Sequence, residues 1–221
     1  MGSITRSFAN NISTSGILTA SAVTNATVED VTSFDNVTGA GTLILLSTQT
    51  ASASATISFT TGLDSTYDEY IFKFINIHPS VSGADLMMNF STDGGSNYNV
   101  TKTTTHFRAF HNEADTATSL AYDTGNDLAQ STADVSVLIN IGSTDADMSG
   151  SGYVELYNPA STTYVKHFIA VANRYDDAVY TVQQFTAGYG NTTSAINAVR
   201  FKMDSGNIDD GIIKMYGVKK S

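Results

Sequence analysis

The sequence predicts an all-β protein: an antiparallel, jelly-roll-like β-sandwich preceded by an extended N-terminal arm. Two observations indicate this class. About ten short segments alternate apolar and polar residues or are rich in β-branched and aromatic residues, and turn residues separate them at intervals of roughly 8–15 residues. In addition, no segment repeats apolar residues at the helical period over three turns. The pattern indicates a two-layer β structure and does not by itself select one Greek-key topology.

The first 40 residues differ from the rest of the chain. Small and β-branched residues surround isolated apolar ones, whose spacing is too irregular for an amphipathic helix or a regular strand. Such a segment cannot bury its apolar side chains against itself. We therefore expect residues 1–40 to form an arm that docks on neighbouring molecules, with a sandwich over 41–221; a partly disordered leader is the alternative. The residues expected to make the docking contact are Phe8, Ile12, Ile17, Leu18, Val23 and Val28.

The first half of the sandwich begins with two short predicted strands, 43–48 and 55–60. Segment 69–77 is apolar on both faces, so we expect it in the centre of a sheet. Its faces are Tyr70, Phe72, Phe74 on one side and Ile71, Ile75, Ile77 on the other. Segment 86–90 alternates and runs into Asp93-Gly94-Gly95, which is a hairpin signal.

A long Thr-rich strand is predicted over 98–110, with His106 and His111 directed to opposite sides of the chain. Residues 111–133 are polar and show no period, so we expect an exposed loop. Further strands are predicted at 135–141, 152–157, 164–172 and 179–188.

The segment from 197 to 219 reads as a closing hairpin, with its turn at Asp204-Ser205-Gly206-Asn207. We expect Gly206 to have a positive φ there. Taken together, the alternating positions predict a core of Phe72, Phe74, Leu86, Met88, Phe90, Val137, Ile139, Leu156, Phe168, Phe201 and Met215.

This closing segment resembles the end of β-sandwich modules in tailed-bacteriophage structural proteins, which follow the pattern ΦxSGNIxxGxIxΦYGΦ, where Φ is apolar. The matching residues are Met203, Ser205, Gly206, Asn207, Ile208, Gly211, Ile213, Met215, Tyr216, Gly217 and Val218. The resemblance extends over about residues 66–219 through the segments 67–76, 89–98 and 152–159. Segment 7–12 is also similar to the opening of many phage virion proteins.

The resemblance implies a non-enzymatic structural protein, made in the bacterial cytoplasm and located in the virion. It favours the jelly-roll topology, because viral modules often use it, and by analogy a homotrimer whose partners are other capsid or tail proteins. Two roles remain open. A tail fibre would contact host glycans through exposed loops such as 111–133, whereas a decoration protein would stabilise the capsid. A carbohydrate-active hydrolase is a third, less favoured class.

Composition excludes several other classes. The net charge of −10, with cations scattered along the chain, leaves no basic patch for nucleic acid. There is no cysteine, so disulfides, thiolate metal sites and cysteine nucleophiles are excluded. The sequence contains no run of about 18 apolar residues, so it predicts no membrane-spanning helix.

The candidate chemical motifs are weak, and we expect no cofactor, no metal and no catalytic residue. Asp145-Ala-Asp147, Asp204–Gly211 and the Asp93 turn bring together oxygen ligands of the kind calcium uses, but none matches an EF-hand loop, and turn formation explains them. Neither a Gly-x-Ser-x-Gly nor a His-Glu-x-x-His motif is present. Six tyrosines crowd the second half of the chain and would suit glycan or subunit contacts; the alternative is that most lie in the core or across strand pairs. They are Tyr153, Tyr157, Tyr164, Tyr175, Tyr180 and Tyr189.

Overall fold

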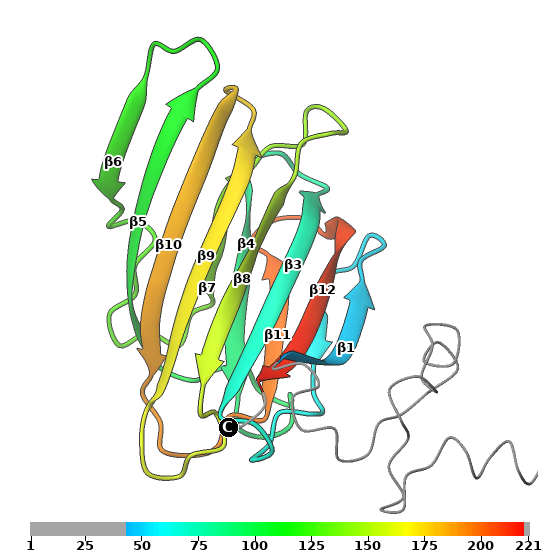
Figure 1. The fold of residues 1–221 in the computed structure, drawn as a ribbon, viewed down its shortest axis with the longest axis vertical. Coiled ribbons are helices and arrows are strands. Elements are labelled where there is room, and N and C mark those ends of the chain that lie inside the picture. Colours follow the sequence, from blue (N-terminus) through cyan, green and yellow to red (C-terminus); the bar gives the residue numbers. More distant parts are fainter. Residues whose placement is uncertain (1–42, 219–221) are drawn as a thin grey trace, which may run out of the picture. The chain divides into compact units, whose positions relative to one another are not determined.

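A computed structural model describes residues 43–218, which form a sandwich of two antiparallel β-sheets (Figure 1). The large sheet has eight strands in the order β1-β12-β3-β8-β9-β10-β5-β6, and the small sheet has four in the order β2-β11-β4-β7. The predicted all-β antiparallel sandwich is therefore confirmed. The strands are β1 (Leu43–Thr50), β2 (Ile57–Phe59), β3 (Glu69–Pro79), β4 (Ala84–Ser91), β5 (Lys102–Asn112), β6 (Thr118–Tyr122), β7 (Val135–Ile141), β8 (Gly150–Tyr157), β9 (Lys166–Asp176), β10 (Tyr180–Gly190), β11 (Ala198–Met203) and β12 (Ile208–Val218).

The strand order is that of a jelly roll with additions. When β1, β8, β9 and β12 are set aside, β2-β11-β4-β7 faces β3-β10-β5-β6, which is the order of the two jelly-roll sheets. The hairpin of β8 and β9 is inserted between β3 and β10, while β12 and β1 extend the large sheet beyond β3. The insertion widens the large sheet, so that part of it extends past the small one.

The closing segment is not a hairpin, and this part of the prediction was wrong. Strand β11 pairs with β2 and β4 in the small sheet, whereas β12 pairs with β1 and β3 in the large sheet. The turn at Gly206, whose φ of 70° confirms the expected positive value, carries the chain from one sheet to the other. Phe201 and Met215 face the same core from opposite sheets. A hairpin and a crossover therefore produce the same alternation of apolar and polar residues in the sequence.

The segment after β4 is a second crossover mistaken for a hairpin. Strand β4 belongs to the small sheet and β5 to the large one, so the Asp93-Gly94-Gly95 turn joins two layers. The Asp93 carboxylate shapes this turn by accepting hydrogen bonds from Ser91 Oγ at 2.6 Å and from the Asn97 amides at 2.7 and 2.8 Å. These bonds hold the pKa of Asp93 down at about 2.

The core lies between the sheets and contains every residue that alternation placed there. All eleven predicted core residues are buried, each with at most 3% of its surface exposed. Phe59, Phe72 and Phe201 form an aromatic cluster with ring centroids 5.3–6.3 Å apart, contributed by β2, β3 and β11. The two-residue period of the sequence therefore identified the inward faces of both sheets.

The predicted two faces of strand β3 hold only up to Phe74. Ile77 is buried beside the aromatic residues and does not lie opposite them, because Asn76 has a φ of 51° and the β3–β8 register shifts between Phe74 and Ile77. Such an irregularity moves later side chains to the other face. Strand β3 is nevertheless interior, between β12 and β8, as expected.

The segment 111–133 is not only a loop, because it contains β6. This strand pairs with β5 in the register Phe107↔Tyr122 and Ala109↔Leu120. All five of its residues are exposed, so no burial pattern marks it in the sequence. It forms one edge of the large sheet (Figure 1).

Candidate binding surface

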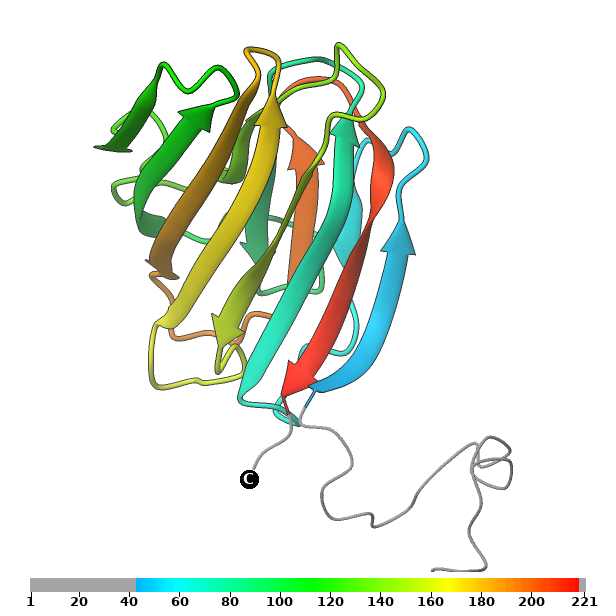
Figure 2. The same ribbon diagram turned by 45° about the horizontal axis from the view of Figure 1, so that its top comes forward.

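The large sheet has one face on the core and a second face that no described element covers (Figure 2). On β5, β8, β9 and β10 the odd-numbered residues point away from the core. We call this set of side chains the outer face. It includes His111 and excludes the buried His106, so the two histidines lie on opposite sides as predicted.

The outer face is unusually apolar for an exposed sheet surface. An antiparallel sheet with one solvated face normally alternates apolar-in and polar-out. Here Phe107 and Ile169 are 39% and 41% exposed, and Phe107 stacks on Phe185 with ring centroids 4.8 Å apart and an interplanar angle of 12°. The register places Phe107 directly opposite Phe185. Contiguous exposed apolar side chains of this kind mark interaction surfaces.

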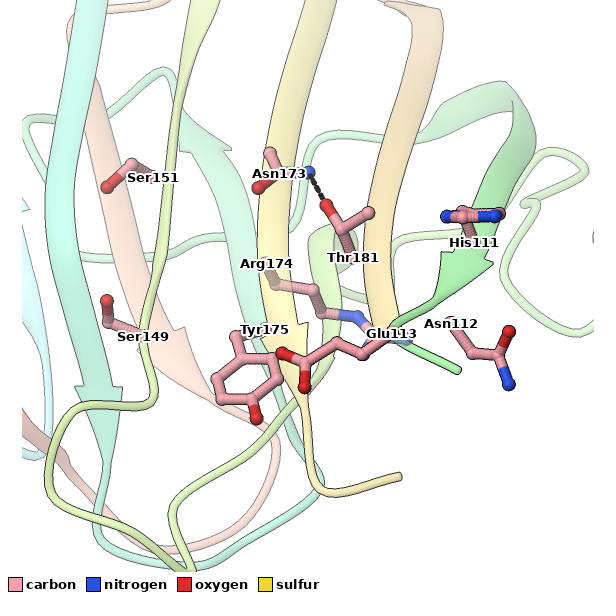
Figure 3. Close-up of a pocket in the computed structure, with 9 residues that line it drawn as sticks. All are labelled: His111, Asn112, Glu113, Ser149, Ser151, Asn173, Arg174, Tyr175 and Thr181. Atoms are coloured by element: carbon pink, nitrogen blue, oxygen red, sulfur yellow. Dashed lines mark hydrogen bonds between the residues drawn. The ribbon is translucent and has the colours of Figure 1, made fainter. Parts of the chain in front are cut away.

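A polar cavity of about 280 Å³ opens at one end of the outer face (Figure 3). Its lining includes Tyr175, Asn173 and Ser151, together with Thr181 and His111. Asn173 donates a hydrogen bond to Thr181 Oγ1 at 2.9 Å, which fixes its amide across β9 and β10. Hydroxyl, amide and aromatic groups thus converge from four segments of the chain.

The same cavity has a negative electrostatic character. The Glu113 side chain extends toward Tyr175 in Figure 3. Desolvation, followed by the charges of Glu113, Asp147 and Asp145, raises the pKa of Tyr175. The upward shift reinforces the protonation that a tyrosine hydroxyl already has at neutral pH. A ligand with a carboxylate or phosphate group would meet like charges at this end.

Inside the sandwich, a buried ion pair supports this end of β9. Arg174 is 2% exposed, and its Nη1 lies 2.5 Å from Asp176 Oδ2, which also accepts a hydrogen bond from Asn140 Nδ2 at 2.8 Å. The Asp176 carboxylate thereby joins β9 to β7 of the other sheet. This pair fixes the backbone from which Asn173 and Tyr175 project outward.

A second, more apolar cavity of about 500 Å³ lies toward the other end of the outer face. Tyr157, His167 and Tyr189 line it, with small Ala187 and Gly188 in the middle. The hollow arises because Ala187 stands in register between Ile169 and Thr105, where larger residues would fill the surface. The three ring side chains around it offer flat apolar surface with polar tips.

Hydrogen bonds orient two of these rings. Tyr157 Oη donates to Glu155 Oε2 at 2.5 Å; burial and then this bond raise the pKa of Tyr157, which keeps the phenol protonated. Gln130 lies in the loop after β6, and its Nε2 donates hydrogen bonds to Tyr189 Oη at 3.4 Å and to Thr103 Oγ1 at 2.7 Å. These bonds hold the Tyr189 side chain in place. The cavity is therefore lined by positioned groups.

The two cavities belong to one elongated surface. Asn173 in the first and Ile169 in the second are four residues apart on β9, or roughly 13 Å along the strand. Between them, Val171 stands in register with Phe185, so apolar side chains connect the polar cavity to the apolar one. The strands β9 and β10 thus form the common floor.

The sequence analysis singled out some residues of this surface but did not predict how they are arranged. Of the six tyrosines, Tyr153, Tyr157, Tyr175 and Tyr189 lie on the outer face, Tyr180 ends the inner face of β10, and Tyr164 is 70% exposed in the loop before β9. None is in the buried core, but all except Tyr164 lie on paired strands, as the cross-strand alternative expected. Asn173, Ala187 and Phe185 were not singled out, because only the register brings them together.

The remaining candidates serve local structure. Asp204 Oδ1 accepts a hydrogen bond from the Asp85 backbone N–H at 2.8 Å. Within residues 43–218, no group of three or more histidine or carboxylate side chains could hold a metal ion. The arm residues Phe8, Ile12, Ile17, Leu18, Val23 and Val28 lie outside the described residues. No helix in the described part of the chain is long and apolar enough to span a bilayer.

Comparison of the chain with family models, curated proteins and solved structures finds no match.

Proposed function

We propose that this chain is a non-enzymatic structural module of a tailed-phage virion that contacts a host-surface glycan through its outer face. The observation that carries the glycan contact is the pair of adjoining cavities on β9 and β10. Their lining combines exposed rings with fixed hydroxyl and amide groups. The virion assignment is supported by the sequence resemblance, and a jelly-roll sandwich is compatible with it.

The chemistry of a glycan matches this surface. Each sugar ring has an apolar C–H side, which packs on a tyrosine or histidine ring, and hydroxyls, which pair with groups such as Asn173 and Thr181. Tyrosine supplies such contact area at low conformational cost, because only two side-chain torsions are fixed. The distance from Tyr175 to His167, eight residues along β9 or roughly 26 Å, accommodates an extended chain of several sugars.

The charges favour a neutral glycan. Glu113 and Glu155 lie on or beside the surface, and the whole chain carries a net charge of −10. An acidic polysaccharide would be repelled over the screening distance of roughly 8 Å at physiological salt. A neutral or amino-substituted polymer avoids this cost.

Two virion roles fit this proposal: a tail fibre and, as the second candidate, a capsid decoration protein. The exposed binding face favours the fibre, since a decoration protein needs no receptor surface. Analogy with other virion proteins suggests a homotrimer, which is an alternative to the two-fold contact inferred below from the sheet edges.

Quantitative gel analysis of purified virions of the encoding phage tests the virion assignment. A fibre is expected in few copies per particle and a decoration protein in many. Absence of the chain from purified particles would contradict the proposal.

An array of immobilised bacterial polysaccharides tests the glycan contact. The full chain is expected to bind one or more neutral polysaccharides and to leave the acidic ones unbound. Release of reducing ends during incubation would contradict the non-enzymatic role. Binding to no polysaccharide, or only to acidic ones, would contradict the surface argument.

A further inference from the structure

Strand β6 directs a row of backbone groups away from the protein. In an antiparallel pair, residues alternate between bonding the neighbour and facing outward. Asp123 N–H bonds His106 O at 2.9 Å and Asn112 N–H bonds Ala117 O at 3.1 Å, which fixes the alternation at both ends of the strand. The N–H and C=O groups of Thr118, Leu120 and Tyr122 therefore point outward, and no hydrogen bond among the described residues reaches them.

The other three edges of the two sheets are protected against pairing. Strand β1 has an irregular register between Leu45 and Ser47, and β2 has only three residues. On β7, Gln184 bonds both backbone groups of Ile139, at 2.9 and 3.3 Å, and Thr186 Oγ1 donates to Ser136 O at 3.1 Å. Bulges, short length and covering side chains are the usual ways in which proteins prevent edge pairing.

Strand β6 has none of these protections. It contains no proline, no charged residue and no register shift, and all five of its residues are exposed. Leu120 and Tyr122 are 73% and 52% exposed. An unprotected edge with exposed apolar side chains is a template for another strand.

We propose that β6 pairs with β6 of a second copy in an antiparallel, two-fold contact centred on Leu120. The outward-facing residues are symmetric about Leu120, since one lies two positions before it and one two positions after. A two-fold axis at Leu120 places each Thr118 opposite Tyr122 of the other copy. Every outward donor then meets an acceptor, and the two large sheets become one continuous sheet.

The side chains fit a second copy as the occupant. Leu120 meets its own equivalent, and Tyr122 continues the aromatic row of Phe185 and Phe107 across the contact. Arg108 Nε lies 3.6 Å from Asp123 Oδ2 and compensates that charge, whereas the Asp127 carboxylate accepts a hydrogen bond from Tyr122 Oη at 2.6 Å. The contact therefore brings one carboxylate of each copy near the shared edge, and salt screens the resulting repulsion.

The contact is small, and the two copies repel each other through their net charge of −10. A five-residue strand pair covers less than the roughly 1,200 Å² typical of stable complexes. We therefore expect a weak dimer, with a dissociation constant in the micromolar to millimolar range, that becomes more populated as salt screens the repulsion. The proposal is independent of glycan binding, although pairing would set two outer faces side by side.

Sedimentation of the full chain, at concentrations up to about 1 mM, tests the proposal. The mass should rise from 23.4 kDa toward twice that value with concentration and with sodium chloride. Leu120→Lys places two like charges at the axis and should abolish the rise. Leu45→Lys, a matched change at a 53% exposed leucine on the opposite edge, should leave it intact. Mixing Leu120→Lys with Leu120→Glu should restore a dimer through opposite charges.

A cross-linking experiment tests the register. The chain has no cysteine, so Leu120→Cys introduces a single thiol. In the proposed register the two Cα atoms lie roughly 5.5 Å apart, within disulfide range, and oxidation should give a covalent dimer that Leu45→Cys does not give. A chain that is monomeric throughout, a Leu120→Lys variant that still associates, or a trimer that survives this change would overturn the proposal.

Discussion

The side-chain amide of Gln184 bonds both backbone groups of Ile139, joining β10 of the large sheet to the free edge of β7 in the small sheet. Gln184 Oε1 accepts the Ile139 N–H at 2.9 Å, and Nε2 donates to the Ile139 carbonyl at 3.3 Å. Both residues are buried, with 1% and 3% of their surfaces exposed. A side chain of one sheet thus completes the hydrogen bonding of the other.

Replacing Gln184 with leucine should therefore destabilise the sandwich. Gln184→Leu leaves a buried donor and a buried acceptor on Ile139 without partners, which should lower the free energy of unfolding by roughly 1–3 kcal/mol. Denaturant unfolding measures this loss. Gln183→Leu, the exposed neighbour on the outer face, is the control, and equal losses in the two variants would show that the inter-sheet bonds do not matter.

Substitutions at two glycines should distinguish the cost of backbone strain from the cost of overpacking. Gly206 and Gly94 have similar positive φ values of 70° and 72°. A Cβ at Gly206 would lie 2.5 Å from Ser80 Oγ, whereas no atom lies within 4 Å of one at Gly94. Thermal melts should show that Gly206→Asn costs about 1–3 kcal/mol, and Gly94→Asn less than about 1 kcal/mol. Comparable melting temperatures for the two variants would contradict the packing argument.

Core and surface phenylalanines should respond differently to truncation. Phe72 is fully buried in the aromatic cluster, so Phe72→Ala should lower the free energy of unfolding by about 3–5 kcal/mol. Phe107 is 39% exposed on the outer face, and Phe107→Ala should cost clearly less. A Phe107→Ala variant as unstable as Phe72→Ala would mean that the outer face is a structural core.

Lys102 should make the free energy of unfolding change with pH in the alkaline range. Its side chain is buried, with Nζ donating to Asn89 Oδ1 at 2.6 Å and to Val100 O at 2.7 Å. Burial lowers the pKa of Lys102 from 10.5 to about 8, although the Asp134 charge opposes the shift. Between these two values the unfolded chain retains a proton that the folded protein has released, so the free energy of unfolding rises with pH.

The measurement is the difference in unfolding free energy between the wild type and Lys102→Met. This difference should shift in favour of the wild type as the pH rises from about 8 to about 10.5. The comparison cancels the titration of tyrosines and other lysines in the same window. A difference that stays constant across the window would show that Lys102 titrates normally.

The inward faces of the strands could be predicted from the sequence because alternation is a local property. Phe72, Phe201 and Met215 were assigned correctly, since burial follows the two-residue period in any sandwich. The structure also explains Gly217 of the closing motif, because the Tyr67 ring lies 2.4 Å from the position that a Cβ would occupy.

Strand pairing and the candidate surface could not be predicted in this way. The link from β11 to β12 has the residues of a hairpin turn, and only long-range pairing decides that it crosses between sheets. Strand β6 is short and wholly exposed, so the sequence alone does not distinguish it from the surrounding polar loop. The cavities depend on the register of β5, β9 and β10, which a single sequence does not contain.

Calorimetric titration of the polysaccharide selected on the array measures whether the outer face binds a neutral glycan. Tyr189→Ala removes a ring from the second cavity, and Tyr164→Ala removes an exposed tyrosine that lines neither cavity. Loss of a stacked aromatic ring should weaken binding by roughly tenfold, which corresponds to about 1.4 kcal/mol. We expect this loss for Tyr189→Ala and unchanged affinity for Tyr164→Ala. Unchanged affinity for Tyr189→Ala, or an equal loss in both variants, would show that the outer face is not the glycan-binding surface.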